Sequence, residues 1–290
     1  MYKIAILGCE NSHAKAFIDL VQNQKLYTDI EVVGVYSHEN EAAQKLTDMF
    51  GVYAASSYDE FVGQIDGLII TARDGANHYK YAKPYIASGI PMFIDKPITN
   101  TEEEAVAFMK ELKAAGVRVF GGSSCVFAEW IQKLKADIQN QTYGKLLGGH
   151  LRAPLDLHSE HGGFFFYAQH LVQVMCELFG DDPKSVKAFR NGDDVTCVFR
   201  YADFDVTAQY ANKSFHTYYA GISCENDYVG TVYSVKGLYT HLLQNFHDLL
   251  EGGAQKISYE KLIKPVFIMN AIKRSFENET EELIGEAGEI

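Results

Sequence analysis

A chain of 290 residues is long enough for two domains of ordinary size. Its 26 basic and 38 acidic residues give a net charge of −12, which repels nucleic acid and anionic membranes, so neither is expected as a partner. No apolar run approaches the ~20 residues that span a bilayer, the start has no cleavable signal pattern, and the 5 cysteines are scattered without a C-x-x-C pair. These features predict a cytoplasmic protein with neither a disulfide framework nor a metal site.

The first half of the chain alternates short apolar runs with helix-length amphipathic stretches. The predicted strands are residues 3–7, 30–36, 67–71, 91–94 and 117–121, and the predicted helices are 14–23, 39–50, 77–87 and 101–115. Strands and helices that alternate at this spacing form βαβ units with right-handed crossovers. The pattern therefore predicts an α/β fold. Residues 1–121 are expected to form a doubly wound parallel sheet, which is a dinucleotide-binding Rossmann domain.

After about Ser123 the rhythm changes. Helices are predicted at 127–138, 166–179, 239–250 and 259–278, a strand at 146–152, and strands with period-2 alternation between 185 and 236. We expect residues 122–290 to form an α+β domain with a mainly antiparallel sheet. The acidic tail from Glu277 is expected to fray.

The first predicted strand ends at Gly8 and leads into a helix. Exposed N–H groups and the helix dipole make this the usual docking place of a dinucleotide pyrophosphate. Of the G-x-G-x-x-G pattern only Gly8 remains, because Glu10 and His13 occupy the other two positions, and a carboxylate at Glu10 would repel the pyrophosphate unless it turned away. A merely capped strand–helix turn is an equally good interpretation. The candidate cofactor-binding residues here are Gly8, Cys9, Asn11, Ser12 and His13, with Asn11 or Ser12 able to cap the helix.

The second predicted strand ends at Ser37 and His38. NAD-binding domains commonly carry Asp or Glu there to hold the ribose hydroxyls of the adenosine. Loss of the acid permits a 2′-phosphate, but no Arg or Lys follows to bind it. Ser37 is a candidate cofactor-binding residue, and the choice between NAD and NADP stays open.

A lysine, Lys96, follows the fourth predicted strand, between Asp95 and Pro97. At the carboxyl end of a parallel strand, and stiffened by the proline, it would point into the crevice where ligands bind. For an arbitrary lysine a solvated loop position is the better interpretation.

Asp95-Lys96-Pro97 resembles the E-K-P signature of the Gfo/Idh/MocA oxidoreductases, with Asp in place of Glu. Residues 87–97, 116–122 and 250–275 are similar to segments of that family in the same order and spacing. The resemblance implies a Rossmann domain, a second domain whose open sheet often mediates dimers or tetramers, and hydride transfer between NAD(P) and a hydroxyl carbon. It also implies that Lys96 contacts the substrate hydroxyl and the nicotinamide ribose, so Asp95 and Lys96 join the candidate cofactor-binding residues.

The turn from Thr71 to His78 replaces the T-P-x-x-x-H turn of the family, without its proline and two residues longer. Arg73 is a candidate ligand for a phosphate or a substrate carboxylate. His78 is expected to cap or pack the next helix. Thr71, Arg73 and His78 complete the candidate cofactor-binding residues.

A second candidate site lies on the predicted helix 166–179. Many family members carry an Asp four residues before a His that serves as general acid/base. This chain keeps the histidine as His170 but has Phe166 at the Asp position, and Tyr167 lies on the same helix face as His170. Histidine, with an ordinary pKa of about 6.5, suits proton exchange with an alcohol. The candidate catalytic residues are Lys96, His170 and Tyr167; a hydrogen-bonded core histidine is the alternative for His170.

The sequence therefore predicts an NAD- or NADP-dependent oxidoreductase acting on a sugar, polyol or related small molecule, and a homodimer or homotetramer formed through the C-terminal sheet. The alternative is a non-catalytic, ligand-sensing or regulatory member with a degraded cofactor site, favoured by the missing glycines, the missing ribose acid and Phe166. A lyase or hydrolase that uses bound NAD transiently is a third interpretation.

Overall fold

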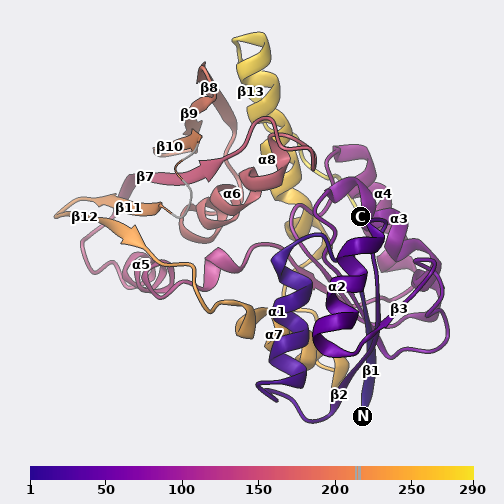
Figure 1. Cartoon of the computed structure of the whole chain (residues 1–290). Coiled ribbons are helices and arrows are strands. Elements are labelled where there is room, and N and C mark those ends of the chain that lie inside the picture. Colours follow the sequence, from indigo (N-terminus) through magenta and orange to yellow (C-terminus); the bar gives the residue numbers. More distant parts are fainter. Residues whose placement is uncertain (213, 215–216) are drawn as a thin grey trace. The chain divides into compact units, whose positions relative to one another are not determined.

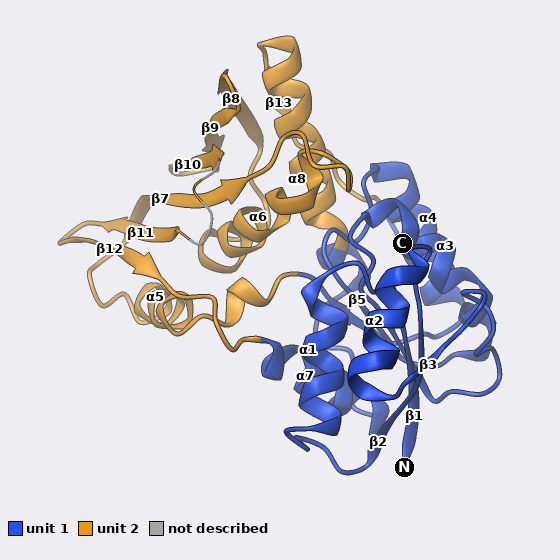
Figure 2. Cartoon of the chain, viewed as in Figure 1, with its two compact units in different colours: residues 1–122, 239–262, 289–290 blue, residues 123–238, 263–288 orange. Residues whose placement is uncertain are grey.

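The computed structural model describes residues 1–212, 214 and 217–290 and divides into two compact units (Figures 1 and 2). Unit 1 contains Met1–Gly122, Tyr239–Leu262 and Glu289–Ile290, and unit 2 contains Ser123–Leu238 and Ile263–Gly288. Among the residues described, no helix is both long and apolar enough to cross a bilayer.

Unit 1 is built on a parallel sheet of six described strands in the order β3-β2-β1-β4-β5-β6. The strands are β1 (Tyr2–Leu7), β2 (Ile30–Tyr36), β3 (Tyr53–Ala54), β4 (Gly67–Ile70), β5 (Met92–Ile94) and β6 (Val119–Gly121). Ile4 to Leu7 of β1 and Leu68 to Ile70 of β4 are fully buried, as continuous apolar strands of a sheet covered on both faces should be. This is the doubly wound Rossmann order, so the predicted fold class is confirmed for this half.

The helices of unit 1 begin and end for identifiable reasons. They are α1 (Ser12–Gln22), α2 (Asn40–Phe50), α3 (His78–Ala82), α4 (Glu102–Ala114) and α7 (Tyr239–Leu250). Thr101 caps α4 by accepting the backbone N–H of Glu104 at 3.3 Å. The single helix predicted over 77–87 is wrong: α3 is short and lies between the 3₁₀ segments Gly75–Asn77 and Lys83–Ser88. Pro84, which has no N–H for an α-helical bond, explains the break.

The segment after residue 238 departs from the expected domain division. We expected 122–290 to form one domain, but Tyr239–Leu262 belongs to unit 1, where α7 lies beside α1 (Figure 1). Beyond α7, Gln255 Oε1 accepts the backbone N–H of Val119 at 2.9 Å, and Tyr259 donates to the carbonyl of Val117 at 2.7 Å. The first bond satisfies a backbone N–H of the edge strand β6, and the second a backbone carbonyl just before this strand; no further described strand of the sheet pairs with either group.

Unit 2 carries a mixed sheet of seven described strands in the order β12-β11-β7-β10-β9-β8-β13. The strands are β7 (Leu146–Leu155), β8 (Ser185–Asn191), β9 (Asp194–Arg200), β10 (Asp205–Asn212), β11 (Tyr218–Cys224), β12 (Tyr228–Tyr233) and β13 (Glu281–Leu283). Of the pairings among these strands, β7 with β10 is parallel and the rest are antiparallel, which confirms the prediction of a mainly antiparallel sheet.

The helices of unit 2 include α5 (Glu129–Gln139) and α6 (Phe165–Phe179), and α8 (Tyr259–Asn278) begins in unit 1 and continues in unit 2. Tyr210 of β10 donates to the carbonyl of Ala168 in α6 at 2.9 Å, which fixes the start of α6 against the sheet. The expected fraying from Glu277 is wrong in part. Glu281 pairs with Lys187 of β8 as the first residue of β13, and its carboxylate accepts a hydrogen bond from Ser185 at 2.5 Å.

Candidate functional site

The loop after β1 is shaped by Gly8. Its φ of +90° is a left-handed conformation, and a Cβ on it would lie 2.2 Å from the backbone N of Ala72 in the loop after β4. Asn11 caps α1 as predicted, accepting the backbone N–H of His13 at 2.8 Å, while its amide donates to the carbonyl of Thr71 at 2.8 Å. The loops after β1 and β4 thus approach each other closely beside the start of α1, and a helix N-terminus is a suitable place for a diphosphate.

Replacing Gly8 by alanine is expected to be far more destabilising than a glycine change that strains φ alone. The matched control is Gly51→Ala, because Gly51 has φ +70° and nothing within 4 Å of an added Cβ. The control should cost about 1–2 kcal/mol for the left-handed conformation, and Gly8→Ala about 1–3 kcal/mol more for the backbone clash. Urea denaturation of the two variants measures the difference, and equal costs would contradict the tight packing inferred at Gly8.

The loop after β4 is joined by hydrogen bonds to the loops after β1 and β5. The hydroxyl of Thr71 donates to the carbonyl of Gly8 at 2.5 Å, and Asn100 donates to Asp74 Oδ1 at 2.7 Å. The ring of His78 is fully buried and lies 2.9 Å from the carbonyl of Ala72 and 3.3 Å from that of Ile98. The position of His78 favours a structural role over direct contact with a cofactor; we propose that it ties the loop after β4 to the loop after β5 that carries Lys96.

The stability of the protein should depend on pH through His78. Burial, opposed by bonds to backbone carbonyls, lowers the pKa of His78 below its ordinary value. The unfolded chain therefore binds one more proton below pH about 6.5, and the free energy of unfolding should fall there by up to ~1.4 kcal/mol per pH unit while being unaffected above it. Urea denaturation between pH 7.5 and 5.5 should show this slope, weakened in His78→Gln and retained in His158→Gln, a change at an exposed histidine. An unchanged slope in His78→Gln would contradict it.

Lys96 lies directly after β5 and is only 4% exposed, which excludes a solvated loop lysine. Its neighbour Asp95 is 1% exposed and forms an ion pair with His13 of α1. Burial alone would raise the pKa of Asp95, but the opposite charge and hydrogen bond of His13 and the charge of Lys96 together lower it, so the carboxylate stays ionised. The loop after β5 thus presents a buried lysine beside a fixed anion.

Glu10, which sequence reasoning treated as an obstacle to the pyrophosphate, turns away from the start of α1. Its Oε1 accepts the hydroxyl hydrogen of Ser37 at 2.6 Å and lies 3.0 Å from Nδ1 of His38, both directly after β2. Cys9 is buried against the carbonyl of Tyr36 at 3.3 Å. Desolvation, assisted by Glu10, raises the pKa of the Cys9 thiol, so only its backbone remains suited to a ligand.

In unit 2, His170 of α6 is 9% exposed, and its Nδ1 lies 2.6 Å from the hydroxyl oxygen of Ser123. The backbone N–H of Ser123 is itself bonded to the side chain of Gln173, one turn along α6. Tyr167 is half-buried, with its ring 6.0 Å from that of His170. The hydroxyl of Ser123 thus holds the ring of His170 through Nδ1. Ser123 was not predicted, because nothing in the spacing of residues 123 and 170 signals their contact.

The predicted residues of unit 1 gather where the parallel strands end. Gly8 to His13 follow β1, Ser37 follows β2, Thr71 and the half-buried Arg73 follow β4, and Asp95 and Lys96 follow β5. This edge, with the reversal of strand order between β1 and β4, is where open α/β sheets bind ligands. His170 and Tyr167 belong to unit 2. In unit 1, Glu10 was not among the candidate cofactor-binding residues, although its carboxylate lies beside the candidate Ser37.

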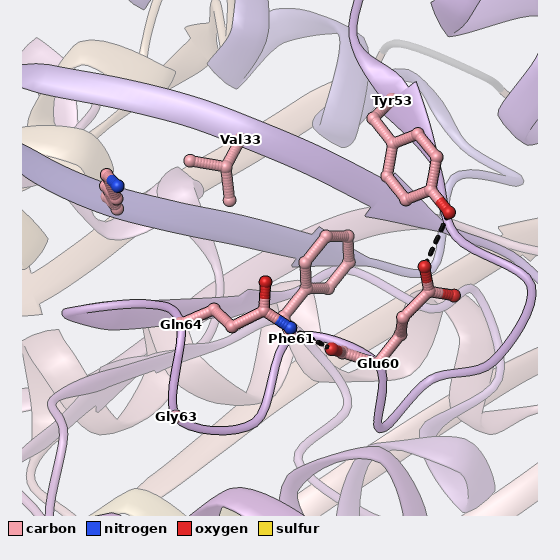
Figure 3. Close-up of a pocket in the computed structure, with 7 residues that line it drawn as sticks. Val33, Tyr53, Glu60, Phe61, Gly63 and Gln64 are labelled. Atoms are coloured by element: carbon pink, nitrogen blue, oxygen red, sulfur yellow. Dashed lines mark hydrogen bonds between the residues drawn. The ribbon is translucent and has the colours of Figure 1, made fainter.

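Two other features of unit 1 lie apart from these loops. A pocket of about 500 Å³ contains none of the predicted site residues (Figure 3). It is lined by Lys3, Val33, Tyr53, Glu60, Phe61, Gly63 and Gln64. Asp29, His247 and Glu251 place ligand-type atoms within 4.8 Å of one another, but His247 already pairs with Asp29 at 2.9 Å and stacks on Tyr27. Neither feature involves the residues at the carboxyl edge of the sheet.

Comparisons with known proteins agree with this geometry. Residues 2–123 match the family model GFO_IDH_MocA, described as an oxidoreductase family with an NAD-binding Rossmann fold. Glucose-6-phosphate 3-dehydrogenase of Bacillus subtilis (strain 168) is 25% identical over 150 residues, which are 51% of this chain and 41% of that protein. The chain thus matches less than half the length of this curated relative.

Solved structures resemble the whole chain in fold. Myo-inositol 2-dehydrogenase from Lactobacillus plantarum has a TM-score of 0.87 at 14% identity, over 98% of this chain and 99% of that one. Scyllo-inositol dehydrogenase from Lactobacillus casei, solved with NAD(H) and scyllo-inositol, has a TM-score of 0.85 at 13% identity, over 98% and 99%. At these identities the likeness shows a shared fold.

Proposed function

We propose that this chain is an NAD(P)-dependent dehydrogenase of the Gfo/Idh/MocA type that acts on a hydroxyl carbon of a sugar, polyol or related small molecule; the match of residues 2–123 to the model of that family supports the proposal. The observation that carries the proposal is Lys96, a buried cation at the carboxyl end of β5 beside the ionised Asp95. A desolvated lysine here suits a substrate oxygen better than bulk water.

The residues at the sheet edge fit a dinucleotide. The missing Cβ of Gly8 lets the backbone of Ala72 approach the loop after β1, next to the start of a helix whose first N–H groups attract a diphosphate. Glu10 does not compete for the start of this helix, because its carboxylate is bonded to Ser37. Gly8, Cys9, Asn11, Ser12 and His13 would surround the diphosphate, and Ser37, Thr71, Arg73 and Asp95 the rest of the cofactor. When bound, the nicotinamide supplies the hydride chemistry that no side chain can provide.

The chain's own groups have distinct proposed roles. Lys96 orients and polarises the substrate oxygen, while Asp95, held by His13, keeps the local charge balanced. His170 exchanges the hydroxyl proton, with Tyr167 assisting it and Ser123 holding its Nδ1. His78 ties the loop that carries Lys96 to the loop after β4.

Titration with NADH and NADPH, followed through the fluorescence of the reduced nicotinamide, tests the proposal first. We expect binding of at least one cofactor, and then reduction of NAD or NADP with a panel of inositols, hexoses and hexose phosphates. Absence of binding of both cofactors at millimolar concentration would refute the dehydrogenase and favour the ligand-sensing alternative. Substrate consumption without net change in reduced nicotinamide would indicate the lyase or hydrolase chemistry instead.

We also propose that the chain forms a homodimer or homotetramer through the sheet of unit 2, and that it works in the cytoplasm. Five large apolar side chains on the described strands of this sheet are more than half exposed: Leu147, Phe189, Tyr228, Val232 and Leu283. Such residues on strands favour burial in an interface. Native mass spectrometry measures the assembly, and a monomer at micromolar concentration would refute it.

A further inference from the structure

Glu10 carries a buried carboxylate oxygen that needs a donor. The side chain is fully buried. Its Oε1 accepts from Ser37, but Oε2, equally inaccessible, has no hydrogen-bond partner among the residues that the structure describes. Buried polar atoms almost always find a partner, and those that do not call for an explanation, such as a ligand group.

The position of this carboxylate indicates which ligand group. β1 and β2 are neighbours in register, with Leu7 opposite Tyr36, so the loops that follow them lie together. In dinucleotide-binding folds the end of the second strand carries an acid that accepts the ribose 2′-hydroxyl, and here Ser37 stands in that region. The carboxylate of Glu10 lies 2.6 Å from the Ser37 hydroxyl, so an acid is present there although it comes from the neighbouring loop.

We propose that Glu10 takes over the function of the missing acid at the end of β2: its carboxylate accepts hydrogen bonds from the adenosine ribose of NAD and excludes the 2′-phosphate of NADP. The inference rests on the proposed function, which supplies a nicotinamide dinucleotide as the ligand. It adds that this ligand is NAD rather than NADP. The side chain of His38, 51% exposed and in contact with the same carboxylate, can move aside to admit the ribose.

The charges of the surrounding segment favour the same choice. A 2′-phosphate would place a second anion beside a buried carboxylate, and like charges brought together out of water repel strongly. Residues 37–44 contain Glu39 and Glu41 and neither lysine nor arginine. Sites for NADP instead carry an arginine near this place.

The experiment measures dissociation constants rather than turnover. NADH and NADPH are titrated by fluorescence, and 5′-ADP and 2′,5′-ADP compete with the bound cofactor, since they differ only by the 2′-phosphate. The unsubstituted chain should bind NADH at least about tenfold more tightly than NADPH. It should likewise bind 5′-ADP at least about tenfold more tightly than 2′,5′-ADP. In Glu10→Gln, which keeps the shape but not the charge, we expect this ratio to fall by about tenfold or more. The matched control is Glu31→Gln, a change at an exposed acid near the start of β2, at the end of the strand away from Ser37, which should keep the ratio.

A second pair of variants covers the case in which Glu10→Gln does not fold. Glu10→Gly restores the glycine usual at this position and should lose the preference for NADH, and adding Ser37→Asp should return it by moving the acid to the end of β2. Equal affinity of the unsubstituted chain for both cofactors would overturn the inference but leave the dehydrogenase proposal intact. If neither cofactor bound, both the inference and the dehydrogenase proposal would be overturned. If Glu10→Gln and Glu10→Gly left the NADH/NADPH selectivity unchanged, the selectivity would come from another group and the inference would be wrong.

Discussion

Replacing Lys96 by methionine is expected to lower kcat by at least about 100-fold, the effect typical of removing one positioned electrostatic or acid–base group. Methionine fills most of the volume of the buried side chain but removes the cation. Because the charge of Lys96 also contributes to the lowered pKa of Asp95, the variant changes the electrostatics of the whole loop after β5. Steady-state assays of nicotinamide reduction measure kcat and KM.

The control for Lys96→Met is Lys110→Met, the same change at an exposed position of α4. It should leave kcat within about twofold, because exposed charges contribute little. NADH titration of both variants shows whether the cofactor site survives. A Lys96→Met protein with near-normal kcat would remove this residue from the mechanism.

Replacing His170 by glutamine is expected to lower kcat by about 100-fold to 10⁴-fold, the range for loss of a general acid–base group. Glutamine retains hydrogen-bonding capacity towards Ser123 but cannot exchange a proton near neutral pH. The variant should therefore also lose the limb of the kcat–pH profile that a histidine produces, which a structural defect alone would not remove.

Two companion variants separate catalysis by His170 from support of its ring. Ser123→Ala removes the contact at Nδ1 and, as a positioning change, should lower kcat less than His170→Gln does while keeping the pH limb. His158→Gln changes an exposed histidine in the loop before α6 and should leave both kcat and the profile intact. If His170→Gln kept its pH limb, a core role would be the correct interpretation of this histidine.

Local sequence patterns were sufficient for most elements of both sheets. Ile4 to Leu7 of β1 and all of β4 form continuous buried apolar runs, and β9 alternates buried Val195, Cys197 and Phe199 with more exposed neighbours. Burial on two faces or one leaves these signatures in the sequence itself. The two-residue strand β3 was missed because it is too short to carry a pattern, and β13 because Glu281 and Glu282 are acidic and owe their conformation to pairing with β8.

What the sequence determined by itself was the order of strands and helices, and hence the edge of the first sheet at which Gly8, Thr71 and Lys96 meet. Only the tertiary structure decided that Glu10 turns towards Ser37, that Ser123 holds His170, and that α7 belongs with the first unit. Periodicity reports which faces of an element are buried, whereas these contacts join residues 27, 47 or more positions apart. Such contacts depend on how separate elements pack, and no local pattern encodes that.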